Sequence, residues 1–246
     1  SFNWPNGSQG GIRRSADEGD SWENVMDAYT GRTITLGSDG NLYASVYPYP
    51  SDESIYRSTD DGDTWQLLTS IGTGNNFFAI TVNSLTTQNT ILAGTRTGVW
   101  RSTDNGNTWS WASSGFPTDT WVRDIEVDSN GIVVAATTNG LFSSEDNGDS
   151  WQQGTGAGIE NDTITKIIFD YPLNSKDDTR LLAGSAGGKL YVAQEDTKYL
   201  NFVLGYAFAS TKEASGFAIA IISAFNTKEF KMAHYPKSNN PGGVSK

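Results

Sequence analysis

Four aspartates recur along the chain at nearly constant spacing, each inside the same short sequence. Asp17, Asp60, Asp104 and Asp146 lie 43, 44 and 42 residues apart, and a glycine follows each of them two positions later. Carboxylates in such a pattern suit calcium binding, acid–base catalysis or the closure of a β-hairpin. Each segment begins with serine and ends with Ser-Trp or Thr-Trp, and we call residues 15–22, 58–65, 102–109 and 144–151 the aspartate turns.

The spacing within the aspartate turns favours hairpin closure. An EF-hand loop places glycine about five positions after its first aspartate and a glutamate about six further on, which these segments do not. An aspartate side chain can accept hydrogen bonds from the amides of its own turn, and the glycine can adopt a positive φ. The tryptophan offers a large apolar body to bury. The residues predicted to be structural for these reasons are Asp17, Gly19, Trp22, Asp60, Gly62, Trp65, Asp104, Gly106, Trp109, Asp146, Gly148 and Trp151.

Composition limits other catalytic chemistry. The chain has no cysteine and one histidine, which excludes disulfides, thiol nucleophiles and Cys/His zinc sites. That histidine, His234, lies in a predicted strand and is interpreted as a plain strand residue. Residues 154–158 have the glycines of a nucleotide loop but no following Lys-Ser/Thr, so they indicate a connector. We therefore predict no metal and no cofactor.

Charge and hydropathy exclude two further classes of partner. A net charge of −11 disfavours nucleic acid and anionic membrane surfaces. The longest apolar run, residues 217–222, is far shorter than the roughly 18 to 20 residues that cross a bilayer, so no membrane insertion is expected. The first residues show no basic segment followed by an apolar one, and we expect no targeting sequence there.

The distance between aspartate turns predicts the fold. A repeat of roughly 40 to 45 residues is the length of one four-stranded propeller blade. Short apolar runs precede each aspartate turn in the same order, as expected for buried strands. Strand A is assigned to residues 33–36, 78–82, 122–127 and 164–169, strand B to residues 42–44, 91–94, 133–136 and 181–184, strand C to the residues before each turn and strand D to those after it. The predicted fold class is all-β, a β-propeller of four-stranded antiparallel blades.

Five blades account for the chain. The last repeat has a strand C at residues 189–192, but residues 193–197 lack the glycine and tryptophan of an aspartate turn. The N-terminus supplies only strands C and D, whereas residues 217–225 and 230–234 resemble strands A and B. Joining the two ends closes one ring, a single domain of residues 1–246, without free sheet edges between blades. The blades are then residues 10–30 with 215–237, 31–70, 75–115, 120–157 and 162–208, and the alternative is a truncated piece of a six- or seven-bladed ring.

The aspartate turns resemble the BNR, or Asp-box, repeats of bacterial sialidases, which also occur in sortilin-type receptors. The resemblance covers residues 10–204 through period and turn sequence. In that family the boxes lie opposite the substrate pocket, which implies that the four aspartates are not catalytic here. Sialidases also carry an Arg-Ile-Pro motif and three carboxylate-binding arginines. This chain has Ile12-Arg13-Arg14-Ser15 instead, so no catalytic residue is transferred to it.

Two classes of function stay open. The first is a secreted or cell-surface, non-catalytic propeller that recognises a glycan or a protein, or serves as a module of a larger extracellular assembly. The second is a glycoside hydrolase, sialidase-like or other, whose pocket lies opposite the aspartate turns and holds a converging carboxylate pair. We favour binding over catalysis. The acidic residues predicted in loops on the pocket side are Asp27, Asp52, Glu53, Asp119, Glu160 and Asp162.

Ligands are expected at the blade ends opposite the aspartate turns, where the B–C loops and D–A connectors emerge. Residues 47–53 form a long B–C loop with two tyrosines stiffened by prolines, and the closing blade adds further aromatic residues. Exposed aromatic side chains beside arginine suit sugar stacking or a protein hot spot. The alternative is that these loops merely vary in length. The candidate binding residues are Tyr47, Tyr49, Tyr235 and Trp4, with Arg32, Arg96 and Arg123 as polar anchors on nearby connectors.

Overall fold

The computed structural model of the chain describes residues 10–28, 30–47, 52–70, 76–156, 158–170, 180–194 and 202–207. By its contacts the chain divides into two compact units, Ser1–Ala209 and Ser210–Lys246, and every described residue belongs to the first. The predicted strands at residues 217–225 and 230–234 lie outside the described residues. The number of blades and the closure of the ring therefore stay predictions.

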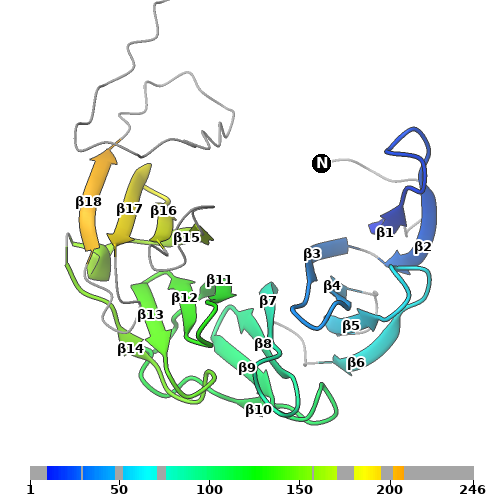
Figure 1. Ribbon diagram of the computed structural model, residues 1–246, viewed down its shortest axis with the longest axis horizontal. Coiled ribbons are helices and arrows are strands. Elements are labelled where there is room, and N and C mark those ends of the chain that lie inside the picture. Colours follow the sequence, from blue (N-terminus) through cyan, green and yellow to red (C-terminus); the bar gives the residue numbers. More distant parts are fainter. Residues whose placement is uncertain are drawn as a thin grey trace, which may run out of the picture. The chain divides into compact units, whose positions relative to one another are not determined.

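Antiparallel β-sheet makes up the described residues apart from turns and one short 3₁₀ helix, η1 (Ile159–Asn161), and the sheets follow one another in chain order (Figure 1). The first sheet has two strands, β1 (Gly10–Arg14) and β2 (Glu23–Ala28). Each of the others has four strands in sequence order, which confirms the predicted four-stranded antiparallel architecture. These sheets are β3 (Thr30–Leu36), β4 (Leu42–Tyr47), β5 (Ser54–Ser58) and β6 (Gln66–Ser70); β7 (Phe77–Asn83), β8 (Thr90–Thr95), β9 (Gly98–Ser102) and β10 (Ser110–Trp111); β11 (Val122–Val127), β12 (Val133–Thr137), β13 (Gly140–Ser144) and β14 (Gln152–Gln153); and β15 (Ile164–Asp170), β16 (Arg180–Ser185), β17 (Lys189–Gln194) and β18 (Phe202–Ala207).

The apolar core lies between neighbouring sheets. Ile80 and Val82 of β7 pack against Tyr43 and Ile55 of the preceding sheet. The same contact recurs twice further along the chain, with Ile125 against Leu92 and Val99, and with Ile167 against Val134 and Leu141. One sheet face therefore meets the preceding sheet and the other meets the following one, which explains why the strands that carry these residues are apolar on both faces.

Each aspartate turn closes the hairpin between the third and fourth strand of its sheet, or between β1 and β2. In the turn after β9, Ser102 Oγ donates to Asp104 Oδ1 at 2.8 Å and accepts the amide of Gly106 at 2.8 Å. The two oxygens of Asp104 accept the amide and the hydroxyl of Thr108 at 2.8 and 2.6 Å. The glycine of each turn has a positive φ, as predicted. The residue before it is also in the left-handed region, with φ of 58° at Glu18, 55° at Asp61, 61° at Asn105 and 59° at Asn147.

The first strand of every four-stranded sheet, which we call the inner strand, contains a β-bulge at the same position. The register shifts between Gly31 and Thr33 in β3, and the shift recurs at the equivalent place in β7, β11 and β15. A bulge leaves one residue out of the pairing and redirects its side chain. The bulged residues are Arg32, Phe78, Arg123 and Thr165. Arg32 and Arg123 thus lie within strands, not on connectors as the sequence analysis placed them.

Candidate functional site

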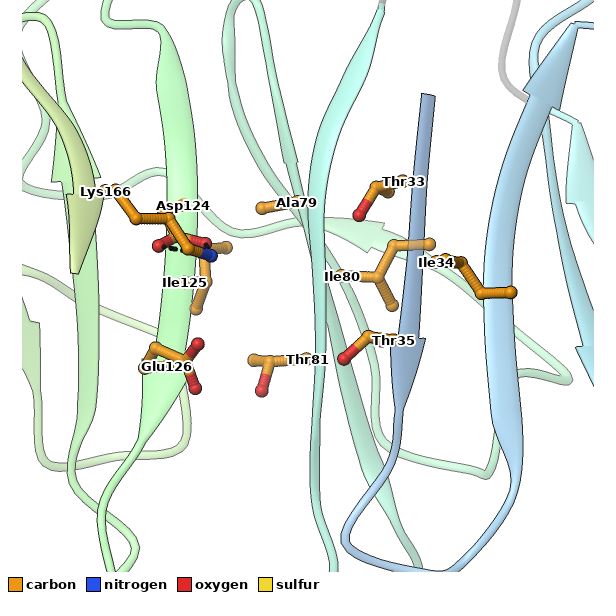
Figure 2. Close-up of a pocket in the computed structure, with 10 residues that line it drawn as sticks. All are labelled: Thr33, Ile34, Thr35, Ala79, Ile80, Thr81, Asp124, Ile125, Glu126 and Lys166. Atoms are coloured by element: carbon orange, nitrogen blue, oxygen red, sulfur yellow. Dashed lines mark hydrogen bonds and ion pairs between the residues drawn. The ribbon is translucent and has the colours of Figure 1, made fainter. Parts of the chain in front are cut away.

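The four inner strands contact one another in chain order, and a small cavity of about 70 Å³ lies along them (Figure 2). This volume holds a few water molecules or the end of one side chain, and it is well below the roughly 300 to 1,000 Å³ of small-molecule pockets. The polar side chains that line the cavity are Thr33, Thr35, Thr81, Asp124, Glu126 and Lys166, and Ile34, Ala79, Ile80 and Ile125 complete the wall.

Asp124 joins two sheets at this cavity. Its carboxylate is buried in β11 and accepts a hydrogen bond from Lys166 Nζ of β15 at 3.0 Å (Figure 2). It also accepts the amide of Ile167, in the same strand, at 2.9 Å. A buried carboxylate needs such partners because an unpaired one would lose its hydration without compensation. Both oxygens of Asp124 are therefore engaged in holding β15 against β11.

Glu126 lies two residues further along β11, on the same face of the strand as Asp124. Burial raises the pKa of Glu126 to about 6, and the negative charge of Asp124 adds to this effect, whereas Lys166 opposes it. The side chain is half-buried, and Figure 2 shows it on the side of β11 that faces Thr81. Near neutral pH the cavity therefore contains a carboxyl group that gains or loses a proton easily.

A second cluster lies at the bulged end of the inner strands and is centred on Trp121, the residue before β11. The Cζ atoms of Arg96 and Arg123 lie 4.5 and 5.4 Å from the centroid of the indole ring. Phe78 stacks on the same indole, with ring centroids 5.9 Å apart and planes inclined by 13°. We call these four residues the Trp121 cluster. Cation–π contacts of this kind contribute roughly 0.5 to 2 kcal/mol each and hold the guanidinium groups in place.

The arginines of the Trp121 cluster keep hydrogen-bonding capacity. Arg96 is exposed in the turn between β8 and β9, and Arg123 is half-buried. Within the described residues neither guanidinium has a carboxylate partner, and Arg123 Nε is buried without a hydrogen-bond acceptor. A guanidinium group has five N–H donors in a planar fork that fits a carboxylate. The cluster thus presents two cationic groups beside an aromatic surface.

Arg32 has partners of its own. Its Nε lies 2.8 Å from Glu53 Oε1, and its Nη2 donates to Asn76 Oδ1 at 3.1 Å. Glu53 is buried, and burial raises its pKa, while Arg32 and the amide of Phe77 act in the opposite direction. The ion pair lies within the sheet of β3 to β6, whereas the hydrogen bond to Asn76 ties that sheet to the residue before β7. These contacts of Arg32 stabilise its own sheet and the junction with the next sheet more directly than they suit ligand capture.

The predicted binding residues are distributed as follows. Tyr49, Tyr235 and Trp4 lie outside the described residues, and Tyr47 is the half-buried last residue of β4. Of the seven candidates the structure brings Arg96 and Arg123 together, on a tryptophan that the sequence analysis did not select. Asp124, Glu126 and Lys166 were also missed. A signal was present, because Asp124 and Glu126 alternate with the apolar residues Ile125 and Val127 in this strand.

The carboxylates considered for a hydrolase have separate environments. Asp162 accepts a hydrogen bond from the hydroxyl of Tyr191 at 2.8 Å and forms an ion pair with Lys189 at 3.1 Å. Asp27 accepts a hydrogen bond from the side-chain amide of Asn24. Asp119 lies in the connector after β10 with φ of 60°, and Asp52 and Glu160 lie beside β5 and in η1. Across the described ranges no three His, Cys, Asp or Glu side chains gather into a group that could hold a metal ion.

The aspartates of the aspartate turns are held as carboxylates by their own turn. Hydrogen bonds from the hydroxyl and amide of Ser21 and from Ser15 lower the pKa of Asp17 to about 2. Burial raises the pKa of Asp146, but the hydroxyl and amide of Ser150 and the hydroxyl of Ser144 outweigh it and lower the pKa to about 2. Similar bonds lower the pKa of Asp60 and Asp104. Lowered values with this cause indicate structural carboxylates, not proton donors near neutral pH.

Comparison with solved structures shows the fold. The chain is similar to an ancestral GH74 enzyme, with a TM-score of 0.59 and 15% identity, over 79% of this chain and 28% of that one. It is also similar to YCF48 bound to D1 peptide, with a TM-score of 0.51 and 16% identity over 81% and 64% of the two chains. A structure described as a gluconolactonase gives a TM-score of 0.51 and 16% identity over 74% and 66%. The chain therefore spans about two thirds or less of these proteins, and its fold is a β-propeller.

Comparison with protein-family models identifies the family of the chain. No curated protein matches the sequence, and none of the helices in the described part of the chain is long and apolar enough to cross a membrane. The family model Sortilin-Vps10, described as sortilin, neurotensin receptor 3, matches residues 53–243. That range includes three of the four aspartate turns and the Trp121 cluster. The chain belongs to the Sortilin-Vps10 family.

Proposed function

We propose that this chain is an extracellular or cell-surface, non-catalytic protein-binding propeller, and that its Trp121 cluster binds an acidic segment of a partner protein. The observation that carries the proposal is the pair of guanidinium groups of Arg96 and Arg123 on one indole ring, without carboxylate partners among the described residues. Arginine and tryptophan are the residue types that dominate binding energy at protein interfaces. The family and the peptide-bound propeller YCF48 support a protein ligand.

The aspartate turns fit this assignment. We propose that they are Asp-box repeats with a structural role, because their carboxylates bond to the serine, threonine and amide groups of their own turns. They lie at one end of the strands, and Arg96 lies at the other end of β9. A ligand at the Trp121 cluster therefore leaves the turns free to close the hairpins.

The glycoside hydrolase alternative has one observation in its favour, the raised pKa of Glu126 beside a carboxylate. A hydrolase needs a second carboxylate that can reach water or the sugar. Asp124 is a poor candidate because it is buried and both of its oxygens accept bonds from β15. The absence of turnover on a panel of aryl glycosides is the expected result, and turnover that Glu126→Gln abolishes would establish the alternative.

The binding proposal is tested with immobilised synthetic peptides, in which acidic peptides that contain an aromatic residue are paired with copies carrying lysine in place of each acid. The parent chain should bind the acidic set and not the lysine set. Arg96→Ala and Arg123→Ala should each weaken binding by about tenfold or more, equivalent to about 1.4 kcal/mol. A glycan array run in parallel reports the other ligand class.

Two matched variants control for charge and for exposed aromatic surface. Arg13 of β1 and Trp111 of β10 are both exposed and lie outside the Trp121 cluster. Arg13→Ala and Trp111→Ala should bind the acidic peptides as the parent does. Equal losses in the cluster variants and in these controls would mean that net charge, and not the Trp121 cluster, governs binding. No binding of any peptide, with glycans bound instead, would reject the protein-binding assignment.

A further inference from the structure

The cavity along the inner strands carries a negative charge that its own lining does not neutralise. Of its two carboxylates, that of Asp124 is paired with Lys166 Nζ at 3.0 Å. The carboxylate of Glu126 forms no hydrogen bond or ion pair with any residue in the described ranges. Its pKa of about 6 leaves it mostly ionised above pH 7. Two negative groups then face one positive group, and the cavity can accept one further cation.

Two threonine hydroxyls line the cavity together with Glu126. Thr35 of β3 and Thr81 of β7 have the place in their strands that Glu126 has in β11, because each is the third residue after the bulged one. Figure 2 shows these three side chains at one level of the neighbouring strands. All three are half-buried, and neither hydroxyl has a hydrogen-bond partner in the part of the chain that the structure describes. Oxygen atoms from three strands are therefore available to one ligand.

We propose that this cavity binds a primary ammonium group, that of a lysine in the same partner segment that the Trp121 cluster binds. The identity of the lysine rests on the proposed function, whereas the ammonium site itself rests on the cavity. An ammonium group has three N–H donors, one for each of Glu126, Thr81 and Thr35. Its positive charge neutralises the carboxylate of Glu126, which makes that hydrogen bond a charge-assisted one.

The rest of the cavity fits a lysine better than a metal ion. Calcium takes roughly six to eight oxygen ligands and magnesium a near-ideal octahedron, and Glu126 is the one carboxylate among the described lining residues that is not already paired. A lysine packs its alkyl stem against apolar surface while its ammonium group makes polar contacts. Ile34 and Ile80 supply such a surface in the wall, and about 70 Å³ holds the end of one side chain.

The β11 strand carries residues of both binding elements, and this sets the distance between them. Arg123 of the Trp121 cluster is the bulged residue of β11, and Glu126 follows three positions later in the same strand. Three residues of strand span about 10 Å, as do three residues of an extended peptide. The partner segment should therefore have an acidic residue and a lysine about three positions apart.

The spacing is tested with the full-length chain and a series of acidic peptides in which one lysine is moved stepwise away from the acidic residue. Affinity should be highest at a spacing of about three residues. At that spacing it should exceed the affinity of the copy with acetyl-lysine by about tenfold, since a charge-assisted hydrogen bond is lost. Equal affinity at every spacing would overturn the proposal, because the net charge of −11 and not the cavity would then attract the lysine.

Substitutions in the cavity assign the effect to its lining. Glu126→Gln keeps the size of the side chain and should abolish the preference for lysine over acetyl-lysine, while binding of the acidic residue still depends on Arg96. Thr81→Val keeps the shape of the side chain and should weaken binding of the lysine peptide severalfold. Glu23→Gln, at an exposed carboxylate of β2, is the control and should keep the preference. A preference that survives Glu126→Gln, or that disappears in Glu23→Gln as well, would contradict the assignment.

A small amine tests the cavity without a partner segment. Saturation-transfer NMR at a pH above 7 should detect n-butylammonium bound to the full-length chain. The signal should fall severalfold in Glu126→Gln, and 1-butanol, which has the same stem without the charge, should give a much weaker one. Binding of n-butylammonium but of no acidic peptide would reject the proposed function and support the ammonium site. Binding of acidic peptides with no gain from lysine and no signal from n-butylammonium would reject the ammonium site and leave the proposed function standing.

Discussion

Arg101 provides a sensitive test of how neighbouring sheets are joined at the aspartate turns. It lies just before Ser102, and its side chain extends into the aspartate turn of the next sheet, where Nε donates to the carbonyl of Asn147 at 2.8 Å. Its Nη1 lies 3.0 Å from Asp149 Oδ1. Arg57 and Arg14, at the equivalent positions, also contact the following turn, through the carbonyl of Asn105 and through Asp63.

The residue before the fourth aspartate turn is not an arginine. Ser143 stands where the others have arginine, and the sheet that follows it, β15 to β18, has no aspartate turn. The arginine is therefore present where there is a turn to receive it, and absent where there is none. This pattern indicates that the arginine serves contact between sheets and not the hairpin of its own sheet.

The magnitude follows from exposure and bond type. Arg101 is 17% exposed, so its charged donor to a backbone carbonyl contributes about 1.5 to 3 kcal/mol. The ion pair with Asp149 adds at most about 1 kcal/mol, because that carboxylate is 69% exposed. Arg101→Met keeps the apolar stem and should lower the free energy of unfolding by about 2 to 3 kcal/mol.

The assay is equilibrium unfolding in urea, with tryptophan fluorescence as the signal. Arg57→Met should cost less, because its bond to the carbonyl of Asn105 is 3.3 Å long. Arg13→Met is the control and should stay within about 0.5 kcal/mol of the parent. In an Asp149→Asn background the loss caused by Arg101→Met should remain largely intact. A change below about 0.5 kcal/mol for Arg101→Met, or a loss that vanishes with Asp149→Asn, would refute the assignment of the energy to the backbone carbonyl.

Three further predictions concern pH and backbone geometry. The pKa of Asp17 is about 2 in the folded chain and about 3.9 in the unfolded one, so the stability it contributes is present above pH 4 and is lost as the pH falls through 2. The melting temperature should therefore fall more steeply between about pH 4 and pH 2 in the parent than in Asp17→Asn, and parallel curves would contradict this. Glu126 has the opposite sign, because a folded pKa of about 6 against about 4.3 unfolded destabilises the fold as the pH rises through this interval. Glu126→Gln should be more stable than the parent by roughly 1 to 2 kcal/mol at pH 8 and by nearly nothing at pH 4. A difference in stability that does not change with pH would contradict this prediction. Gly115 has φ of 100°, and an added Cβ would lie 1.9 Å from the carbonyl oxygen of Trp151, so Gly115→Ala should lower the free energy of unfolding by about 3 kcal/mol or more. Gly158 has φ of 80° and open space around it, so Gly158→Ala should lower that free energy by about 1 kcal/mol. Similar losses for the two variants would show that the carbonyl of Trp151 moves easily.

The repeated features of the fold were predictable because the same local physics acts four times. Each Ser-x-Asp-x-Gly segment closes its hairpin through bonds between near neighbours in sequence, so no knowledge of distant residues was needed. The strands around it follow from apolar runs that must be buried on both faces. Strand ends were less accurate, as for strand A of the first complete sheet, expected at residues 33–36 and observed at Thr30–Leu36.

The site was less predictable because its contacts cross sheets. Trp121 meets Arg96, 25 residues earlier in the chain, and Phe78, 43 residues earlier. Their proximity depends on the register shift that redirects the bulged residues, and bulges in these strands leave no glycine or proline signal at the shifted position. The same holds for Asp124, whose partner Lys166 becomes visible only when β15 is placed beside β11.

The position of the charges along the strands is compatible with the acidic ligand that we propose for this acidic protein. The four aspartate turns contain three, three, one and three acidic residues and no lysine or arginine, so they hold −10 of the net charge of −11. Arg96 lies at the opposite end of β9 from the turn after it, and five residues of strand span about 17 Å. The Debye length at physiological salt is about 8 Å, so the field of the turns is largely screened at that distance. The aspartate turns can therefore close the hairpins and keep the protein in solution without repelling a carboxylate from the Trp121 cluster, whereas at an ionic strength near 0.01 M, with a Debye length of about 30 Å, they should slow the approach of an acidic peptide.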